Sequence, residues 1–271
     1  MANPLKIGVV GASGRMGRMV ISIIAAASDC ELAGASEAPG SAHVGADAGV
    51  LAGVGDNGVI VTGDTAAMFG GVEAVIDFTV PVATMAHAQL AADANCALVA
   101  GTTGLEEEHR AALQAAAVAV PIVWAPNMSA GVNLLFAVTQ QVARALGEDF
   151  DIEILEMHHH HKIDAPSGTA LGLGQAAAAG RGVDFDAVKI LSREGVTGER
   201  KPGDIGFATL RGGDVVGEHT VIFAGAGERI ELSHRATDRA IFARGAVRAA
   251  LWTAGKPAGF YAMNDVLGLS I

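Results

Sequence analysis

The sequence predicts an α/β protein with two domains: a doubly wound parallel sheet, and an inserted α+β domain with a mixed sheet. The first half alternates short apolar runs with helical segments, which is typical of a parallel sheet covered by helices. The second half has strand-like runs separated by short glycine turns, which favours antiparallel pairing. The length of 271 residues fits two domains of ordinary size. We expect domains at 1–129 and 130–237, with a helix and tail at 238–271 returning to the first domain.

The first domain is predicted from apolar, β-branched runs and from helix start signals. Its expected strands are residues 5–10, 31–37, 59–62, 74–78, 97–100 and 122–125. Its expected helices are residues 16–27, 81–95 and 106–118. Pro81 suits the first turn of a helix, and acidic residues in the first turn of the third helix match its dipole. Residues 40–58 are rich in Gly, Ala and Asp without periodicity, which predicts a loop.

The second domain changes pattern after Asn127. Helices are expected at residues 131–146 and 167–179, and strands at 151–157, 206–210, 215–224 and 229–234. Short glycine turns at 212–214 and 225–227 predict antiparallel pairing of the strands that they join. A helix at 238–253 and a short tail close the chain.

Composition narrows the classes of function. The net charge of −11 repels phosphate backbones, which argues against nucleic-acid binding. The mean hydropathy is +0.38, but no apolar stretch is long enough to span a membrane and no signal peptide is evident, so we expect a cytoplasmic protein. Cys30 and Cys96 lack metal-ligand spacing and are expected to be buried thiols. Charged residues make up only 17%, which favours an oligomer.

A glycine turn lies between the first expected strand and helix. Residues 11–17 have the form G-x-x-G-x-x-G, a Rossmann-like arrangement. Gly11 permits a tight turn, Gly14 lets the backbone approach a pyrophosphate, and Gly17 lets the helix pack close to the strand. The N-terminus of the helix offers N–H groups to an anion, and Arg15 adds a positive charge.

Glu37 strengthens this interpretation. It lies twenty residues beyond Gly17 at the end of the second expected strand, where a carboxylate accepts hydrogen bonds from an adenosine ribose. Taken alone, the glycines also fit a strand–helix turn without a ligand, and Glu37 fits a solvated loop charge. Together they predict a dinucleotide-binding domain.

The densest chemical signal is the run of four histidines at residues 158–161, followed by Lys162. Consecutive residues cannot all face one ion, and no acidic or cysteine partner lies at ligand spacing, so we expect no metal. The interpretation that we favour is a cationic pocket for a small dicarboxylate, in which an imidazole delivers a proton. Ser167, Gly168 and Thr169 begin an expected helix and offer N–H donors to a second carboxylate.

Further segments accompany the glycine turn and the histidine run. They are residues 76–79, 101–104, 125–129, 192–195, 206–209 and 217–219. With residues 10–17 and 156–170, they make the whole chain resemble the dihydrodipicolinate reductases, also called 4-hydroxy-tetrahydrodipicolinate reductases. The stretch 158–170 carries most of the specificity. The resemblance implies reduction of a cyclic imine dicarboxylate by hydride transfer from NAD(P)H, in the diaminopimelate route to lysine. It also implies a homotetramer built through the sheet of the second domain.

The resemblance implies a role for each matching position. The implied cofactor contacts are Gly11, Ala12, Ser13, Gly14, Arg15 and Met16 for the phosphates, Glu37 and Ala38 for the ribose, and Gly101, Thr102, Thr103, Ala125, Pro126, Asn127 and Met128 for the nicotinamide. The implied proton donors are His158 and Lys162, and the implied substrate contacts are His159, Gly168 and Thr169. His160 and His161 either join this pocket or only pack.

One departure bears on the cofactor. Many relatives carry Arg directly after the ribose-binding acid, and this chain has Ala38 there. Because Glu37 repels a 2′-phosphate and Ala38 offers no counter-charge, we expect NADH to be preferred over NADPH. Three alternatives remain at this point: another two-domain reductase of small anions, a dinucleotide sensor without catalysis, and a metal-dependent hydrolase.

Overall fold

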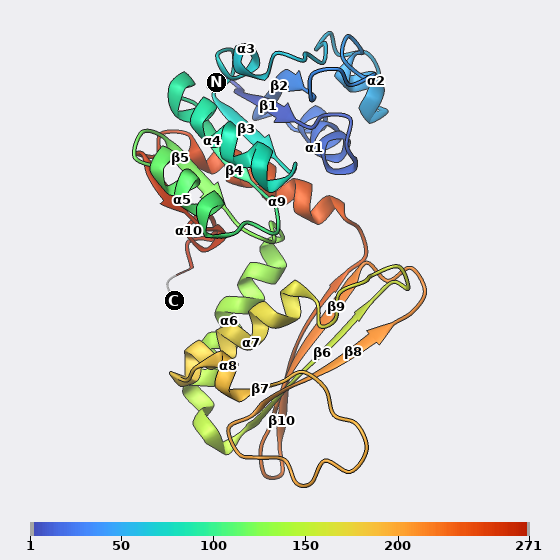
Figure 1. The fold of residues 1–271 in the computed structure, drawn as a ribbon, viewed down its shortest axis with the longest axis vertical. Coiled ribbons are helices and arrows are strands. Elements are labelled where there is room, and N and C mark those ends of the chain that lie inside the picture. The colour runs from blue at the N-terminus through green and yellow to red at the C-terminus, as the bar shows by residue number, and fades with distance from the viewer. Residues whose placement is uncertain (1–2, 270–271) are drawn as a thin grey trace. The chain divides into compact units, whose positions relative to one another are not determined.

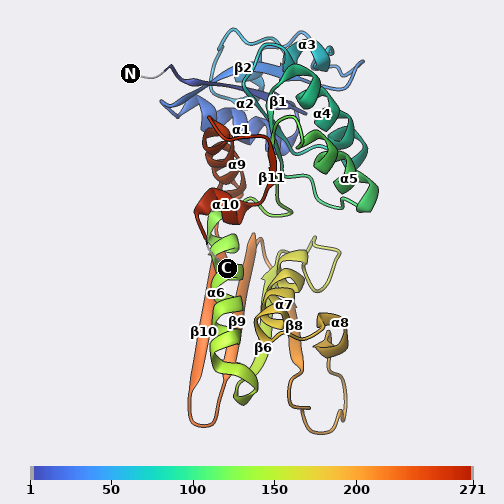
Figure 2. The ribbon, with the colours of Figure 1, turned by 90° about the vertical axis from the view of Figure 1, so that its left-hand side faces the viewer.

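The computed structural model describes residues 3–269, which form two compact units (Figures 1 and 2). One unit consists of the chain up to Ala130 together with Ala240–Gly268, and the other is mainly Gly131–Arg239. No helix among the described residues is long and apolar enough to cross a membrane. The last two residues of the expected tail, 270 and 271, lie outside the described part of the chain.

The first unit is built on a six-stranded parallel sheet. Its elements are β1 (Leu5–Val10), α1 (Arg15–Ala25), β2 (Cys30–Ser36), α2 (Ala48–Ala52), α3 (Thr65–Phe69), β3 (Ala74–Asp77), α4 (Pro81–Ala94), β4 (Ala97–Ala100), α5 (Glu107–Ala116), β5 (Pro121–Trp124), α9 (Ala240–Thr253), β11 (Gly259–Tyr261) and α10 (Met263–Leu267). The strand order is β11-β5-β4-β3-β1-β2. The predicted doubly wound parallel sheet is therefore confirmed.

Helices cover both faces of this sheet. Side chains of α1, α9 and α10 pack on one face, and those of α3, α4 and α5 pack on the other. The central strands β3 and β4 are buried along their full length, because each has a helical layer on both sides. Their apolar sequences, AVID and ALVA, reflect this position, and the Asp that ends β3 is the exception.

Several local predictions for this unit were wrong. The segment 40–58 was expected to be a loop, but it contains α2, where the Asp47 side chain accepts a hydrogen bond from Val50 N–H and starts a short helix. The segment 59–62 was expected to be a strand, but only isolated bridges form at Ile60 and Thr62. The expected tail contains β11 and α10, and β11 adds an edge strand beside β5.

The second unit is built on a five-stranded mixed sheet covered by helices on one face (Figure 1). Its elements are α6 (Ala130–Leu146), a 3₁₀ turn (Gly147–Asp149), β6 (Asp151–His158), α7 (Gly168–Arg181), α8 (Phe185–Val188), β7 (Lys189–Ile190), β8 (Ile205–Arg211), β9 (Gly217–Ala224) and β10 (Arg229–Ala236). The strand order is β10-β9-β6-β8-β7. Strand β6 runs antiparallel to β9 and parallel to β8. The predicted mixed sheet is confirmed.

The expected hairpin between β8 and β9 does not form, although β9 and β10 do pair antiparallel. Strand β6 lies between β8 and β9. The glycine turn that joins β8 to β9 therefore crosses the end of β6. Gly212 N–H donates to the His158 carbonyl at 2.9 Å, and His159 N–H donates to the Val215 carbonyl at 2.7 Å. The turn is therefore hydrogen-bonded to the backbone of His158 and His159, where β6 ends and the histidine segment (residues 158–161) begins.

Candidate active site

The glycine turn has the backbone geometry that its sequence predicts. Gly11 has a φ of +64°, which L side chains rarely adopt. A Cβ at Gly17 would lie 2.2 Å from the Gly11 carbonyl oxygen, so only glycine allows α1 to begin this close to β1. Gly14 is the N-cap of α1, and no side chain caps this end of the helix. The first turn of α1 therefore presents uncapped N–H groups to an anion.

Glu37 lies against this turn. Its Oε1 accepts hydrogen bonds from Ser13 N–H at 2.8 Å and from the Ser13 hydroxyl at 2.6 Å. Ala12 is buried and its N–H donates to the Ser36 carbonyl, so Ala12 acts here as part of the scaffold. The turn and the end of β2 thus place a carboxylate next to the helix N-terminus.

A cavity of about 310 Å³ lies at the carboxyl ends of the strands of the first unit. It is lined by Met16, Phe78, Thr79, Gly101, Thr102, Thr103, Pro126, Asn127, Met128 and Phe242. The structure therefore brings six of the seven expected nicotinamide contacts to one cavity, with Met16 from the glycine turn. Ala125, the seventh, is buried.

A buried polar network stands behind this cavity. The Asp77 carboxylate ends β3 and is fully buried, and it accepts hydrogen bonds from Thr79 N–H at 2.7 Å and from the Thr79 hydroxyl at 2.6 Å. Its second oxygen lies 2.8 Å from His87 Nδ1. Burial raises the pKa of Asp77, but the hydrogen bonds and charge of His87 and the bonds from Thr79 outweigh it, so the net pKa is lowered. Asp77 thus remains a carboxylate that orients Thr79 in the cavity wall.

In the second unit, the alternation of β6 places Glu156 and His158 on its buried face together with Ile152 and Ile154. His158 Nδ1 lies 2.5 Å from Glu156 Oε2. A Cβ at Gly217 would lie 3.0 Å from His158 Nε2, so glycine at this position keeps space open beside that nitrogen. The His158–Glu156 pair is therefore joined through Nδ1 of His158, while Nε2 faces Gly217, which has no side chain.

Glu156 is 1% exposed and is surrounded by donors. Arg211 binds both of its oxygens at 2.9 Å, and Ser167 N–H and the Thr209 hydroxyl donate to Oε1. Burial raises the pKa of Glu156, but the hydrogen bonds and charges of His158 and Arg211 more than offset it and lower the pKa to about 2. Glu156 is therefore ionised at neutral pH, which makes His158 Nδ1 the donor of their hydrogen bond.

His219, from the neighbouring strand β9, is buried beside His158. The two rings meet edge to face with centroids 5.1 Å apart. Burial, followed by the charge of His158, lowers the pKa of His219 to about 4, so this ring is neutral at pH 7. Its Nε2 lies 2.9 Å from the Ser167 hydroxyl.

The loop after β6 carries the remaining cations. Lys162 Nζ donates to Asp164 Oδ1 at 2.7 Å. His159 Nε2 lies 3.4 Å from Arg239 Nη2, and burial together with the charge of Arg239 lowers the pKa of His159. His160 is exposed, and its Nδ1 lies 2.9 Å from the Gly213 carbonyl oxygen, so the structure gives it a structural contact.

The N-terminus of α7 lies against the same pair. Ser167 is its N-cap, and its hydroxyl oxygen accepts a hydrogen bond from Ala170 N–H at 3.1 Å. Because Ser167 N–H donates to Glu156, the cap is attached to the partner of His158. Gly168 and Thr169 form the first turn of this helix, so its positive end lies close to the Glu156–His158 pair.

Sequence reasoning assigned no role to Glu156, Arg211, His219 or Arg239, although the structure places all four beside the expected site. The period-two alternation of β6 carried a signal for Glu156, since it puts this acid on the same side as His158 and the apolar residues. Nothing in the spacing of the other three marks them, because each reaches the site from another strand or from the end of the unit.

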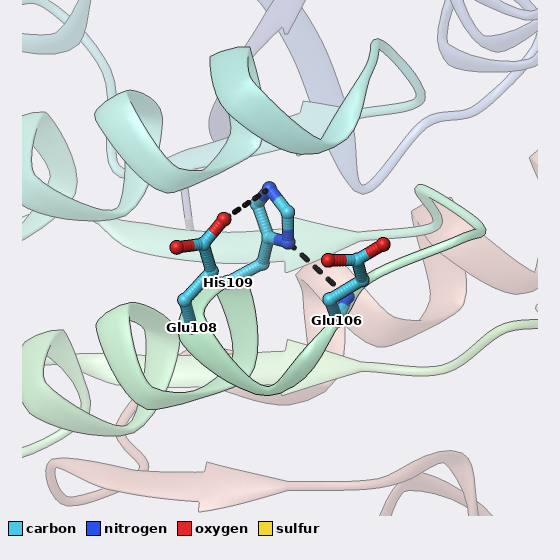
Figure 3. A group of neighbouring side chains, drawn as sticks. All are labelled: Glu106, Glu108 and His109. Atoms are coloured by element: carbon cyan, nitrogen blue, oxygen red, sulfur yellow. Dashed lines mark hydrogen bonds and ion pairs between the residues drawn. The ribbon is translucent and has the colours of Figure 1, made fainter.

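A group of possible metal ligands, Glu106, Glu108 and His109, lies at the start of α5, away from the histidine segment in the chain (Figure 3). His109 Nδ1 accepts the Glu106 N–H at 3.1 Å, and its Nε2 lies 3.9 Å from Glu108 Oε1. His109 thus caps the helix by a capping-box arrangement. The cluster is explained by the start of the helix, and we assign no metal to it.

Comparison with known proteins decides the family. The family model described as "Dihydrodipicolinate reductase, N-terminus" matches residues 5–128, and the one described as "Dihydrodipicolinate reductase, C-terminus" matches residues 131–267. The chain belongs to the dihydrodipicolinate reductase family. The resemblance drawn from the motifs is thereby confirmed, and the matches cover both units of this family member.

Relatives named 4-hydroxy-tetrahydrodipicolinate reductase are similar over nearly the whole chain. The protein of Ruegeria sp. (strain TM1040) is 58% identical over 97% of this chain and 98% of its own. That of Thiobacillus denitrificans (strain ATCC 25259 / T1) is 52% identical over 98% of this chain and 99% of its own. A solved structure, the dipicolinate-bound dihydrodipicolinate reductase from Paenisporosarcina sp. TG-14, has a TM-score of 0.74, with 20% identity, and covers 96% of this chain and 98% of its own. At that identity the structural match supports the fold of this reductase family member.

Proposed function

We propose that this protein reduces 4-hydroxy-tetrahydrodipicolinate to tetrahydrodipicolinate with a nicotinamide dinucleotide, in the diaminopimelate route to lysine. Family membership and the relatives' names support this reaction. The observation that carries the proposal is His158, hydrogen-bonded at Nδ1 to the buried carboxylate of Glu156 and followed in the chain by the loop of Lys162. A bound dinucleotide supplies the hydride.

The first unit fits the dinucleotide. The uncapped N-terminus of α1 suits a pyrophosphate, since N–H groups and the helix dipole both favour an anion there. Glu37 suits the ribose hydroxyls, and in the structure the Ser13 hydroxyl and N–H occupy its Oε1. The cavity that Met16 helps to line has both apolar and polar residues, which suits a nicotinamide ring.

His158 is the proposed proton donor. Because Glu156 accepts the Nδ1 proton, the proton that His158 delivers is carried at Nε2. Nε2 lies beside Gly217, where a Cβ would be at 3.0 Å and would fill the space next to it. From this atom the proton passes to the substrate ring. The pair therefore holds one proton and delivers the other.

Cations and helix N–H groups form the proposed dicarboxylate pocket. Lys162, His159 and Arg239 supply positive or donor groups, and the first turn of α7 supplies the N–H groups of Gly168 and Thr169. These groups oppose the overall acidic charge of the chain, as a small dianionic substrate requires. They also stabilise the electron density that moves onto the ring during reduction.

A turnover experiment tests the reaction. NADH oxidation is followed by the fall in absorbance at about 340 nm, with substrate generated in situ from pyruvate and aspartate semialdehyde. We expect rapid oxidation by the wild type, and a loss of about 10²-fold or more in kcat for His158→Ala with NADH affinity preserved. A chelator should leave the rate unchanged, which separates this activity from that of a metal-dependent hydrolase. A wild-type protein that is folded but does not oxidise either cofactor would refute the proposal.

The same assay tests the cofactor preference. We propose that NADH is preferred over NADPH, because Glu37 repels the 2′-phosphate and Ala38 provides no cation to offset it. The variant Ala38→Arg should shift the ratio of kcat/KM values toward NADPH by about tenfold, and Ala38→Gln, which adds length without charge, is its control. Equal or better efficiency of the wild type with NADPH would contradict this proposal.

We also propose a homotetramer that assembles through the sheet of the second unit. Helices α6 and α7 pack on one face of this sheet, and within the described residues of this unit no helix covers the other face (Figure 1). That face carries half-buried Leu155, Met157 and Ile222, and Leu210 at 48% exposure. Light scattering should give four times the chain mass of 27.3 kDa. Leu210→Glu should lower the oligomer mass, and a monomeric wild type would contradict the proposal.

A further inference from the structure

A row of polar residues crosses the sheet of the second unit. Thr209 on β8 lies opposite Glu156 on β6, Glu156 lies opposite His219 on β9, and His219 lies opposite His234 on β10. Residues directly opposite one another on neighbouring strands share one face of a sheet, so the row lies on the face that α7 covers. Two members of the row already have contacts described above: Glu156 is bonded to His158, and Thr209 donates to Glu156. His219 is buried beside them, and the reaction proposed above gives it no task.

The hydrogen bonds around Ser167 determine the form of His219. The Ser167 hydroxyl oxygen accepts Ala170 N–H, and Ser167 N–H donates to Glu156. The hydroxyl has one proton, and His219 Nε2, at 2.9 Å, is the acceptor that the structure offers for it. His219 Nε2 is therefore unprotonated, which agrees with a ring that burial keeps neutral at pH 7. Its proton is at Nδ1, a buried atom without a hydrogen-bond partner among the described residues.

This arrangement connects the parts of the site. Ser167 is at once the N-cap of α7, a donor to Glu156 and a donor to His219. His219 also contacts His158 ring to ring. Leaving Nδ1 of a buried histidine without a partner costs free energy, so its retention calls for a compensating role. We propose that His219 is a positioning residue, which holds the Ser167 hydroxyl and thereby sets the first turn of α7 relative to the His158–Glu156 pair. This role rests on the reductase function proposed above.

The charged groups around His219 are consistent with that role. Beyond burial, the charges of His158, His234 and Lys162 oppose a positive charge on it, and the charge of Glu156 favours one. A protonated His219 would donate rather than accept at Nε2, so the Ser167 hydroxyl would lose its acceptor and its own proton would have to turn away from His219. The neutral ring therefore keeps its acceptor while the charge of the neighbouring His158 changes during the reaction.

Binding of pyridine-2,6-dicarboxylate in the presence of NADH tests the proposal by calorimetry. His219→Phe keeps the aromatic ring and removes the acceptor, and Ser167→Ala removes the donor. Each should weaken dicarboxylate binding about tenfold. The double variant should be no weaker than about the worse single variant, because both single variants delete the Ser167–His219 bond and Ser167→Ala additionally removes the N-cap acceptor of α7. His219→Gln restores an acceptor near the Nε2 position and should bind within about threefold of wild type. His234→Phe, in the same row, is the matched control and should stay within about twofold.

Kinetics separate a positioning role from a merely structural one. In His219→Phe the KM for the substrate should rise about tenfold with kcat within about threefold, and the dissociation constant of NADH should not change. Independent, multiplying effects of the two single variants, or a His219→Phe variant equal to wild type, would overturn the proposal. If His219→Phe does not fold, Ser167→Ala decides it: unaltered dicarboxylate binding would overturn the proposal, and a tenfold loss would support it. A wild type without turnover would instead count against the reductase function itself.

Discussion

The Glu156 carboxylate provides a quantitative test of the site, through the variant Glu156→Gln. The side chain is 1% exposed, and hydrogen bonds and charges from His158 and Arg211 outweigh burial to lower its pKa from 4.5 to about 2. A group with a lowered pKa stabilises the fold above its unfolded pKa, and this stability is lost as the pH falls toward the folded value. By proton linkage, this pKa shift corresponds to a contribution of about 3 kcal/mol to the free energy of unfolding at pH 7.

Glutamine has the shape of the protonated acid and no charge. The free energy of unfolding of Glu156→Gln should therefore be about 3 kcal/mol lower than that of the wild type at pH 7. This difference, the stability gap, should narrow to about 1.4 kcal/mol near pH 3. Urea unfolding of both proteins, at one protein concentration and at several pH values from 7 to 3, measures the gap. The variant should also lose about 10²-fold in kcat, because His158 no longer has a charged partner.

A matched control is Glu218→Gln on the neighbouring strand. Glu218 is 41% exposed and lies 3.5 Å from Arg235, and such a surface pair contributes about 0–1 kcal/mol. Its stability curve should follow that of the wild type. A Glu156→Gln gap below about 1 kcal/mol at pH 7, or one that does not change with pH, would refute the inference that Glu156 is an ionised, stabilising carboxylate.

Three further substitutions test other parts of the structure. Gly17→Ala places a Cβ 2.2 Å from the Gly11 carbonyl oxygen, so NADH should bind at least about tenfold more weakly in a fluorescence titration; unchanged affinity would contradict the phosphate turn. Gly217→Ala places a Cβ 3.0 Å from His158 Nε2 and should lower kcat about tenfold with NADH affinity unaltered, whereas a wild-type kcat would contradict the assigned proton path. Asp77→Asn should lower the Tm at pH 7 and less so in acid, since the pKa of Asp77 is held low; a Tm difference independent of pH would argue against its charge.

The first unit was largely predictable because its determinants are local. The glycine spacing from Gly11 to Gly17, the apolar runs of the strands and Pro at the start of α4 each act over a few residues of chain. The missed elements were short. Helix α2 has five residues and depends on a single cap at Asp47, and β11 is a three-residue strand that is stable only because β5 pairs with it. Neither has enough residues to show a period.

The histidine segment and its proposed chemistry were also identified from the sequence, but the groups that orient His158 were not. His158 and Lys162 stood out by composition. The partner that orients His158, Glu156, is two residues before it and begins the matching stretch 156–170, but it was assigned no role. Arg211, which neutralises that partner, is 55 residues further along the chain. Its approach depends on β8 lying beside β6, and the turn signal after β8 had indicated β9 as its neighbour instead.

The sequence by itself therefore determined the class of sheet in each domain, and it located the glycine turn proposed to bind the dinucleotide and the segment proposed to carry the proton donor. These follow from hydrophobic period, glycine position and residue type, all of which act within one element or one turn. Only the tertiary structure decided the order of strands in the second sheet, and with it the contacts of Glu156 with Arg211 and of Ser167 with His219. Such contacts join strands and helices distant in the chain, and which strands become neighbours depends on the packing of the whole unit rather than on any local pattern.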